Sequence, residues 1–321
     1  MKMVFFGSSE FSVYVLDELK LHNILPVIVV TTPDKPKGRK LVMTGTPVKI
    51  WAQENNIEVL DPSSLKNNPS LISNLISLNS DLFLVASYGK IIPKEIFEIP
   101  ERKTLNIHPS LLPKYRGASP IQSQILSDEK EIGVTIMQIE ETMDTGPVIV
   151  QKTSPLTPLL DLGEGKHSSY DKISSVSSLL PSPDQGEGGR RPGGVLGRKE
   201  LEKILAIEGA RLFAHILPEW LMGAIDPIMQ DESKATYCQK IKKEDGELQI
   251  DLDNMPTGEI ALKYLCKIKA FEEWPTTYFF LNGKRIIITD ATIEDGNLKI
   301  LRVIPEGKKE MFFEDFKRGI K

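Results

Sequence analysis

Met3-Val4-Phe5-Phe6, followed by Gly7-Ser8-Ser9, describes a buried strand that turns directly into a helix. All four residues of the first stretch are apolar, so both faces of this strand must be covered. Serine is a preferred residue for capping the N-terminus of a helix. Apolar residues then recur at helical spacing from Phe11 to Leu19, which predicts a helix that ends near Leu21.

The same alternation of strands and helices continues as far as residue 107. Continuous apolar strands separated by helical segments imply a parallel sheet covered on both faces. We therefore expect an α/β fold, with a Rossmann-like, mostly parallel sheet and helices on both faces. The dinucleotide fingerprint Gly-x-Gly-x-x-Gly is absent, which disfavours an NAD-dependent enzyme. The expected strands are Pro26–Thr31, Ile57–Leu60, Asp81–Ala86 and Lys103–Ile107, and the expected helix is Pro47–Glu54.

Beyond residue 234 the pattern changes to short alternating strands. A long amphipathic helix is expected over Leu201–Leu221, and the polar run after it predicts a linker over residues 226–234. Asn282-Gly283 is a strong signal for a tight hairpin turn. Short strands with such turns predict a small closed β-barrel. Its expected strands are Thr277–Leu281, Arg285–Thr289, Ala291–Ile293 and Leu298–Val303. The chain is therefore divided into a first domain over residues 1–225, the linker, and a second domain over residues 235–321.

Residues 154–197 differ in composition from their surroundings. Leu156–Gly165 and Leu179–Gly188 share the pattern Leu-x-Pro-x-x-Asp-x-Gly-Glu-Gly, and the tract is rich in Ser, Gly and Pro. Such a composition cannot bury enough apolar surface to offset the entropy lost on ordering. We therefore predict a low-complexity, disordered insertion without a function of its own, whose deletion should leave activity nearly intact.

The composition is that of a globular protein in a reducing compartment. The chain has 321 residues, enough for two domains, and a net charge of −4 that does not by itself indicate nucleic-acid binding. Two cysteines and four scattered histidines show no metal-ligand spacing, so we expect a cytoplasmic protein without a metal. No apolar stretch approaches the ~20 residues that span a bilayer, and nothing demands more than a monomer.

Asn106-Ile107-His108 carries the strongest chemical signal, because it ends an apolar run. Residues two apart on a strand point to the same side, so an amide and a titratable base meet at a strand end. Asp144 follows in a Gly-containing loop. The amide would steady an oxyanion, the imidazole would move a proton, and the carboxylate would orient the imidazole. This set suits acyl transfer, although a lone Asn-x-His is a weak signal and His108 or Asp144 could serve structure alone.

The motif around these residues is much longer. Asn106-x-His108 is followed by Ser110-Leu111-Leu112-Pro113, by Arg116-Gly117 and finally by Asp144-Thr145-Gly146. In this order the residues resemble the signature of the folate-dependent formyltransferases. Phe271–Pro275 and Pro305–Phe316 are similar to the C-terminal domain of the methionyl-tRNA formyltransferases, which is OB-like. The resemblance covers nearly the whole chain apart from residues 154–197.

The resemblance implies transfer of a formyl group from 10-formyltetrahydrofolate, a co-substrate, to the amino group of methionine on initiator tRNA. By analogy, Asn106 and His108 would stabilise the oxyanion, and His108 with Asp144 would accept the proton of the amine. The second domain would then be an OB-like β-barrel that binds tRNA. The folate pocket would be lined by Ser110, Leu111, Leu112 and Pro113.

Residues 32–43 are expected to form a mobile, electropositive loop after the second strand. On charge alone, this loop is either a solvated surface segment or an arm that contacts phosphates. The resemblance favours the arm, because methionyl-tRNA formyltransferases carry a basic loop at this place. The candidate tRNA-binding residues are Lys35, Lys37, Arg39 and Lys40.

Three alternatives remain open on the sequence. A formyltransferase of the same superfamily acting on a ribonucleotide or a nucleotide sugar would be expected to lack the basic loop and the C-terminal tail. A serine hydrolase would use Ser110 with His108 and Asp144, yet no Gly-x-Ser-x-Gly elbow is present. A catalytically silent RNA-binding protein would have no need of the Asn, His and Asp.

Overall fold

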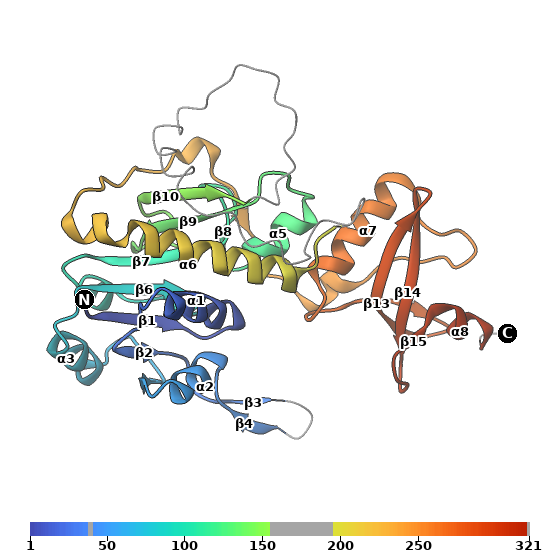
Figure 1. The fold of residues 1–321 in the computed structure, drawn as a ribbon. Helices are drawn as coiled ribbons and strands as arrows, with labels where there is room; N and C mark the ends of the chain where they lie inside the picture. Colours follow the sequence, from blue (N-terminus) through green and yellow to red (C-terminus); the bar gives the residue numbers. More distant parts are fainter. Residues whose placement is uncertain (38–40, 155–194, 320–321) are drawn as a thin grey trace, which may run out of the picture. The chain divides into compact units, whose positions relative to one another are not determined.

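The computed structural model describes residues 1–37, 41–154 and 195–319, which fall into two compact units (Figure 1). The first unit contains residues 1–118, 131–154 and 202–237 of this set, and the second contains residues 119–130, 195–201 and 238–319. Most of the predicted insertion lies outside the described residues.

The first unit is built on a seven-stranded sheet with the order β10-β9-β7-β6-β1-β2-β5. The five strands from β7 to β5 in this order run parallel to one another. Only β9 runs against them, and β10 returns antiparallel to β9. The expected mostly parallel sheet is thus confirmed. The strands are β1 (Met3–Gly7), β2 (Ile28–Val30), β5 (Glu58–Leu60), β6 (Leu82–Ala86), β7 (Thr104–His108), β9 (Gly133–Gln138) and β10 (Val148–Thr153).

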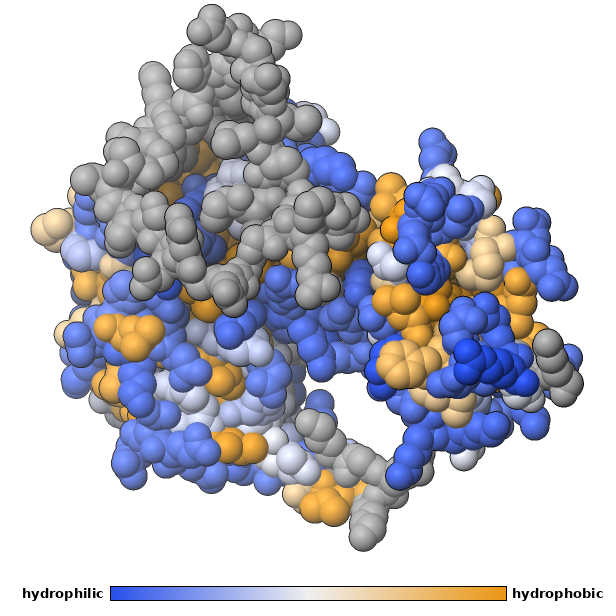
Figure 2. All heavy atoms as spheres, turned by 45° about the vertical axis from the view of Figure 1, so that its right-hand side comes forward, coloured by the Kyte–Doolittle hydropathy of each residue, from blue (hydrophilic) through white to orange (hydrophobic). Residues whose placement is uncertain are grey.

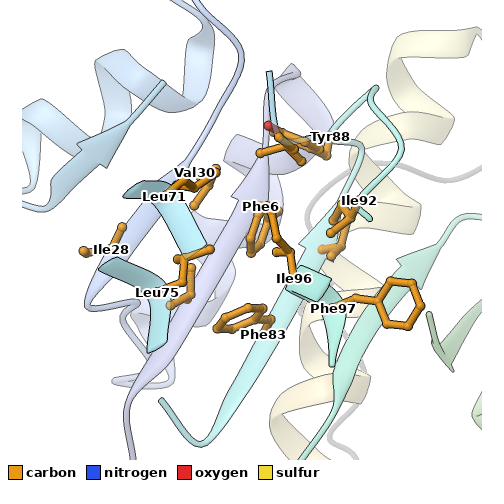
Figure 3. Packing of buried hydrophobic residues seen from close by; sticks show 13 residues of the cluster. Phe6, Ile28, Val30, Leu71, Leu75, Phe83, Tyr88, Ile92, Ile96 and Phe97 are labelled. Atoms are coloured by element: carbon orange, nitrogen blue, oxygen red, sulfur yellow. The ribbon is translucent and has the colours of Figure 1, made fainter. Parts of the chain in front are cut away.

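Helices cover both faces of this sheet. On one face, the side chains of Phe6 and Phe83 pack with residues of α3 and α4, and Figure 3 shows Leu71, Leu75, Ile96 and Phe97 around them. On the opposite face, α6 crosses β7 and β9 at Gly209, where a Cβ would lie 2.4 Å from the Ile107 side chain. The helices up to residue 222 are α1 (Glu10–Leu21), α2 (Pro47–Glu54), α3 (Pro69–Ser77), α4 (Lys94–Phe97) and α6 (Arg198–Met222), while α5 (Pro120–Leu126) belongs to the second unit.

Residues 35–37 and 42–44 correct one expectation, because they form two paired strands, here called the hairpin, where the sequence predicted a loop. β3 (Lys35–Lys37) pairs antiparallel with β4 (Val42–Thr44). Pro36 and Gly38, with Pro33 just before them, are typical of a loop, although proline is tolerated on an edge strand. Two further short strands pair with each other, β8 (Arg116–Gly117) and β11 (Tyr237–Cys238), and two 3-10 turns cover Glu232–Lys234 and Lys243–Gly246.

The second unit contains an antiparallel, barrel-like sheet with the order β12-β13-β14-β15. Two strands predicted on either side of residue 290 form the single strand β13, because an irregularity between Ile288 and Ala291 shifts the register without ending the strand. This unit has its own apolar core, and Figure 2 shows apolar patches among its polar surface residues. Its elements are β12 (Thr277–Leu281), β13 (Lys284–Glu294), β14 (Asn297–Pro305), β15 (Met311–Phe312), α7 (Gly258–Ala270) and α8 (Phe313–Arg318).

None of the described helices combines the length and the apolar character needed to cross a bilayer.

Candidate active site

The end of β7 places Asn106 and His108 on one side of the strand, as the spacing predicted. The pairing of β7 with β9 fixes both positions, because Asn106 lies opposite Met137 and His108 opposite Thr135. His108 is 4% exposed, whereas Asn106 is half-buried. The Asn106 amide makes no hydrogen bond to any residue that the structure describes, so its donors are available to a ligand.

The two ring nitrogens of His108 face different oxygens. Nε2 lies 3.1 Å from the carbonyl oxygen of Tyr115, and Nδ1 lies 3.7 Å from Oδ1 of Asp144. A carbonyl can only accept a hydrogen bond, so in the neutral ring Nε2 carries the proton and donates it. Nδ1 is then the basic nitrogen. After it gains a proton, it can donate toward the carboxylate.

Asp144 is held in a strained turn between β9 and β10. Its φ of +56° lies in the left-handed region, which aspartate tolerates better than most residues. Its Oδ2 accepts a hydrogen bond of 2.8 Å from the backbone N–H of Gly117. Gly146 is required two residues later, because a Cβ there would lie 2.0 Å from the carbonyl oxygen of Gln138. The Asp-Thr-Gly string thus has a steric reason as well as a chemical one.

Ser110 and Leu112 are turned into the protein. The Ser110 hydroxyl is fully buried and donates to the carbonyl of Lys114 at 2.7 Å. The hydroxyl of Thr135 donates to the Ser110 carbonyl at 2.6 Å and accepts from the Leu112 N–H at 3.1 Å. Leu112 precedes a cis bond to Pro113 and packs with Met137 and Val148. The four residues Ser110 to Pro113 lie shortly after β7, and their assignment to the folate stays a prediction.

The geometry disfavours the hydrolase alternative. A serine nucleophile needs a hydrogen bond to its base. Here Ser110 Oγ donates to a backbone carbonyl, and the Nε2 of His108 is bound to another carbonyl.

The candidate tRNA residues are only partly described. Lys35 is exposed on β3 and the backbone of Lys37 ends that strand, while Arg39 and Lys40 lie outside the described residues. At the base of the hairpin, the ammonium of Lys49 binds Asp34 and Asp61, each at 2.7 Å. Hydrogen bonds to Asp34 and Asp61 raise the pKa of Lys49. Leu41, Val42 and Met43 are exposed, as the prediction of a surface segment over residues 32–43 implies.

Two residues beside the Asp144 turn complete the site. Arg116 belongs to the signature, but its complete burial was not predicted. Gln230 was assigned to a linker, yet its side chain contacts the backbone of Asp144 and Gly146. The sequence carried no signal for this contact. Within the described residues, no three His, Cys, Asp or Glu side chains are arranged to hold a metal ion.

Comparisons with known proteins identify the family of the chain. A sequence model of the family described as formyl transferase matches residues 1–173. The chain is 34% identical to a methionyl-tRNA formyltransferase of Dictyoglomus thermophilum, over 99% of this chain and 97% of its relative. It is also 34% identical to a methionyl-tRNA formyltransferase of Bacillus velezensis, over 99% of this chain and 94% of that protein.

Solved structures with low identity share the fold. A methionyl-tRNA formyltransferase from Clostridium thermocellum has a TM-score of 0.52 at 16% identity, with 95% of this chain and 98% of that chain covered. An N-formyltransferase from Helicobacter canadensis in complex with folinic acid and dTDP-3-aminofucose has a TM-score of 0.56 at 17% identity, with 92% and 88% covered. The identity and coverage of its sequence relatives show that the chain belongs to the formyl transferase family and, within it, to the methionyl-tRNA formyltransferases.

Proposed function

We propose that this protein transfers the formyl group of 10-formyltetrahydrofolate to the α-amino group of methionine on initiator tRNA. The observation that supports it best is the convergence of three polar groups. Nδ1 of His108 faces Oδ1 of Asp144 at 3.7 Å, and the amide of Asn106 lies on the same side of β7. Family membership supplies the donor and the acceptor, and the geometry supplies a role for each group.

Asn106 would act on the carbonyl oxygen of the formyl group. Attack by the amine makes the formyl carbon tetrahedral and puts negative charge on that oxygen. An amide N–H that is free of protein partners can donate to it without first breaking a bond, which is the basis of oxyanion stabilisation.

His108 would handle the proton. The attacking amine becomes positively charged and loses a proton to Nδ1, and the resulting imidazolium then points its new N–H toward Asp144. Collapse of the intermediate breaks the bond from the formyl carbon to the folate nitrogen, which takes the proton back from His108. The products are the formylated amine and tetrahydrofolate, and the imidazole returns to its neutral form.

The acceptor is proposed to be tRNA because of the hairpin β3–β4. Its described part presents the exposed cation Lys35 beside exposed apolar residues, a combination that suits contact with a nucleic-acid backbone and base. We propose Lys35, Lys37, Arg39 and Lys40 as phosphate contacts. A monomer in the cytoplasm is the simplest setting, in line with the composition.

The test is a formylation assay with three acceptors: methionine charged on initiator tRNA, methionine charged on elongator tRNA, and a nucleotide-linked amino sugar. Formylation of the first, with much slower turnover of the other two, is expected. Preferred formylation of the amino sugar would replace the proposed acceptor while retaining the chemistry. No formylation of any acceptor would refute both.

A further inference from the structure

We propose that residues 228–237, here called the strap, hold Asp144 in its working position, and that Gln230 is the positioning residue that does so. This inference rests on the proposed function, since it assigns a purpose to Asp144. The sequence marked most of this segment as a linker. In the structure it belongs to the first unit, where it contacts the segment that follows β7 and the turn that carries Asp144.

The strap is anchored at both ends by backbone hydrogen bonds. At its start, Ile228 and Val148 exchange two hydrogen bonds of 2.8 Å, which ties the strap to β10 just after the Asp144 turn. Near its end, the N–H of Thr236 donates to Pro113 at 3.1 Å, and its carbonyl accepts from Arg116 at 2.9 Å. These anchors leave Gln230 little freedom to move away from the turn.

Every hydrogen-bonding position of the Gln230 side-chain amide is occupied. Its Nε2 donates to the carbonyl of Asp144 at 2.9 Å and to the carbonyl of Gly146 at 2.7 Å. Its Oε1 accepts from Nε and Nη2 of Arg116 at 3.0 and 2.8 Å. Two donors and two acceptor positions are the full capacity of a glutamine side chain. The orientation of the amide is therefore unambiguous, and the two carbonyls on either side of Thr145 are bridged by one rigid group.

Arg116 provides the fixed end of this chain of contacts. Its guanidinium is fully buried and binds both carboxylate oxygens of Glu232, at 2.7 and 2.9 Å, and the hydroxyl of Tyr237 at 3.1 Å. Such two-pronged pairs hold their partners in one geometry. Glu232 and Tyr237 both belong to the strap, so the strap supplies the side chains that orient Arg116. Arg116 in turn orients the amide of Gln230, which is also part of the strap.

The consequence concerns the carboxylate. Asp144 has a left-handed φ of +56° and is fixed by a hydrogen bond from Gly117 to Oδ2 and by Gln230 at its carbonyl. If the bond from Gln230 is lost, the turn can relax and carry Oδ1 away from His108. A small displacement of a catalytic group is enough to slow a reaction by about 100-fold. The effect should fall on kcat, because the strap residues act through Asp144.

The decisive experiment is a double-mutant cycle in the full chain with Gln230→Met and Asp144→Asn, in which single-turnover formylation with enzyme in excess gives the rate of the chemical step and steady-state formylation gives KM. Gln230→Met is expected to slow turnover about 10- to 100-fold with KM for both substrates changed little. In the Asp144→Asn background the same substitution should slow turnover hardly any further, because the carboxylate that Gln230 positions is already absent. Equal losses in both backgrounds, or normal turnover of Gln230→Met, would overturn the inference.

Further variants separate position from folding. Gln230→Glu keeps the contact to Arg116 and loses both donors to the turn, so it should be as slow as Gln230→Met while its thermal unfolding stays cooperative. Gln249→Met removes an exposed glutamine of the second unit and should change nothing. If Asp144→Asn itself turned over normally, the proposed role of Asp144 would fail, whereas a slow Asp144→Asn with a normal Gln230→Met would refute the strap alone.

Discussion

At the scale of single residues, the geometry around His108 suits the proton transfer proposed for it. In the neutral ring, Nδ1 offers a lone pair to a carboxylate, and the two groups lie 3.7 Å apart, beyond hydrogen-bond length. After proton transfer, the same pair becomes an N–H donor facing an anion. An interaction that strengthens as the reaction proceeds raises kcat, whereas one that is equally strong throughout does not.

Replacement of Asn106, the proposed oxyanion donor, should slow catalysis strongly without affecting folding. Asn106→Ala is expected to reduce kcat by ~10²–10³-fold, the usual effect of removing one such donor. The half-buried side chain makes no hydrogen bond within the described residues, so unfolding should be almost unchanged. Single-turnover formylation measures the first effect and urea denaturation the second. Asn74→Ala, at an exposed position of α3, is the matched control. A turnover of Asn106→Ala within a few-fold of the parent would remove Asn106 from the mechanism.

Tyr88 carries a buried polar atom that the fold does not use. Its ring packs edge-on against Phe6 and is 2% exposed, and its hydroxyl has no hydrogen-bond partner among the described residues. Burial raises the pKa of Tyr88 to about 12. Tyr88→Phe should therefore raise the free energy of unfolding by about 1 kcal/mol in urea titrations. Tyr264→Phe gives the contrast, because its hydroxyl donates to Gln249. A loss of stability in Tyr88→Phe would show that the hydroxyl has a partner, such as water.

At the scale of elements, α6 and β7 meet at a glycine. A Cβ on Gly209 would lie 2.4 Å from Ile107 and 3.0 Å from Val134. Gly209→Ala should destabilise the fold by about 1–3 kcal/mol through overpacking, although alanine is the better helix former. Because Ile107 lies between Asn106 and His108, kcat should fall as well. Gly319→Ala is the control, since its Cβ would meet nothing closer than 3.5 Å. A more stable Gly209→Ala protein would mean that α6 can shift freely.

The strap should also respond to pH. The hydrogen bond from Arg116 lowers the pKa of Glu232 below its ordinary value of 4.5. A lowered folded-state pKa stabilises the fold above the unfolded-state pKa, and this stabilisation is lost as pH falls through the folded-state value. The melting temperature of the parent should thus exceed that of Glu232→Gln at neutral pH, and the gap should close as the pH falls below the ordinary value of 4.5 and through the lowered pKa of Glu232. A gap that stays constant over this range would show that the charge of Glu232 contributes nothing.

At the scale of the whole molecule, the features predicted correctly from the sequence are those that depend on the spacing of residues close together along the chain. The spacing of Asn106 and His108 gave their common side, and continuous apolar runs gave the parallel strands. The contacts of Gln230 were not predicted, because its partners Arg116, Asp144 and Gly146 lie 114, 86 and 84 residues away along the chain. No local sequence pattern indicates contacts over such separations. The paired strands β3 and β4 were not predicted for the opposite reason, since Pro33, Pro36 and Gly38 form a local pattern that favours a loop.

The division of the chain into units leads to the last prediction. α5 belongs to the second unit, although it lies between two strands of the first unit in the sequence, and it packs against α7. Its residues Ile121 and Ile125 are 7% and 5% exposed. A chain ending at Tyr237 would lose α7 and expose this apolar face, so it should bind the dye ANS and melt at a lower temperature than the full chain. Replacing Ile121 and Ile125 by serine in the truncated chain should reduce the dye binding. A truncated chain that melts like the full chain and causes no increase in ANS fluorescence would show that α5 does not need α7 as a packing partner.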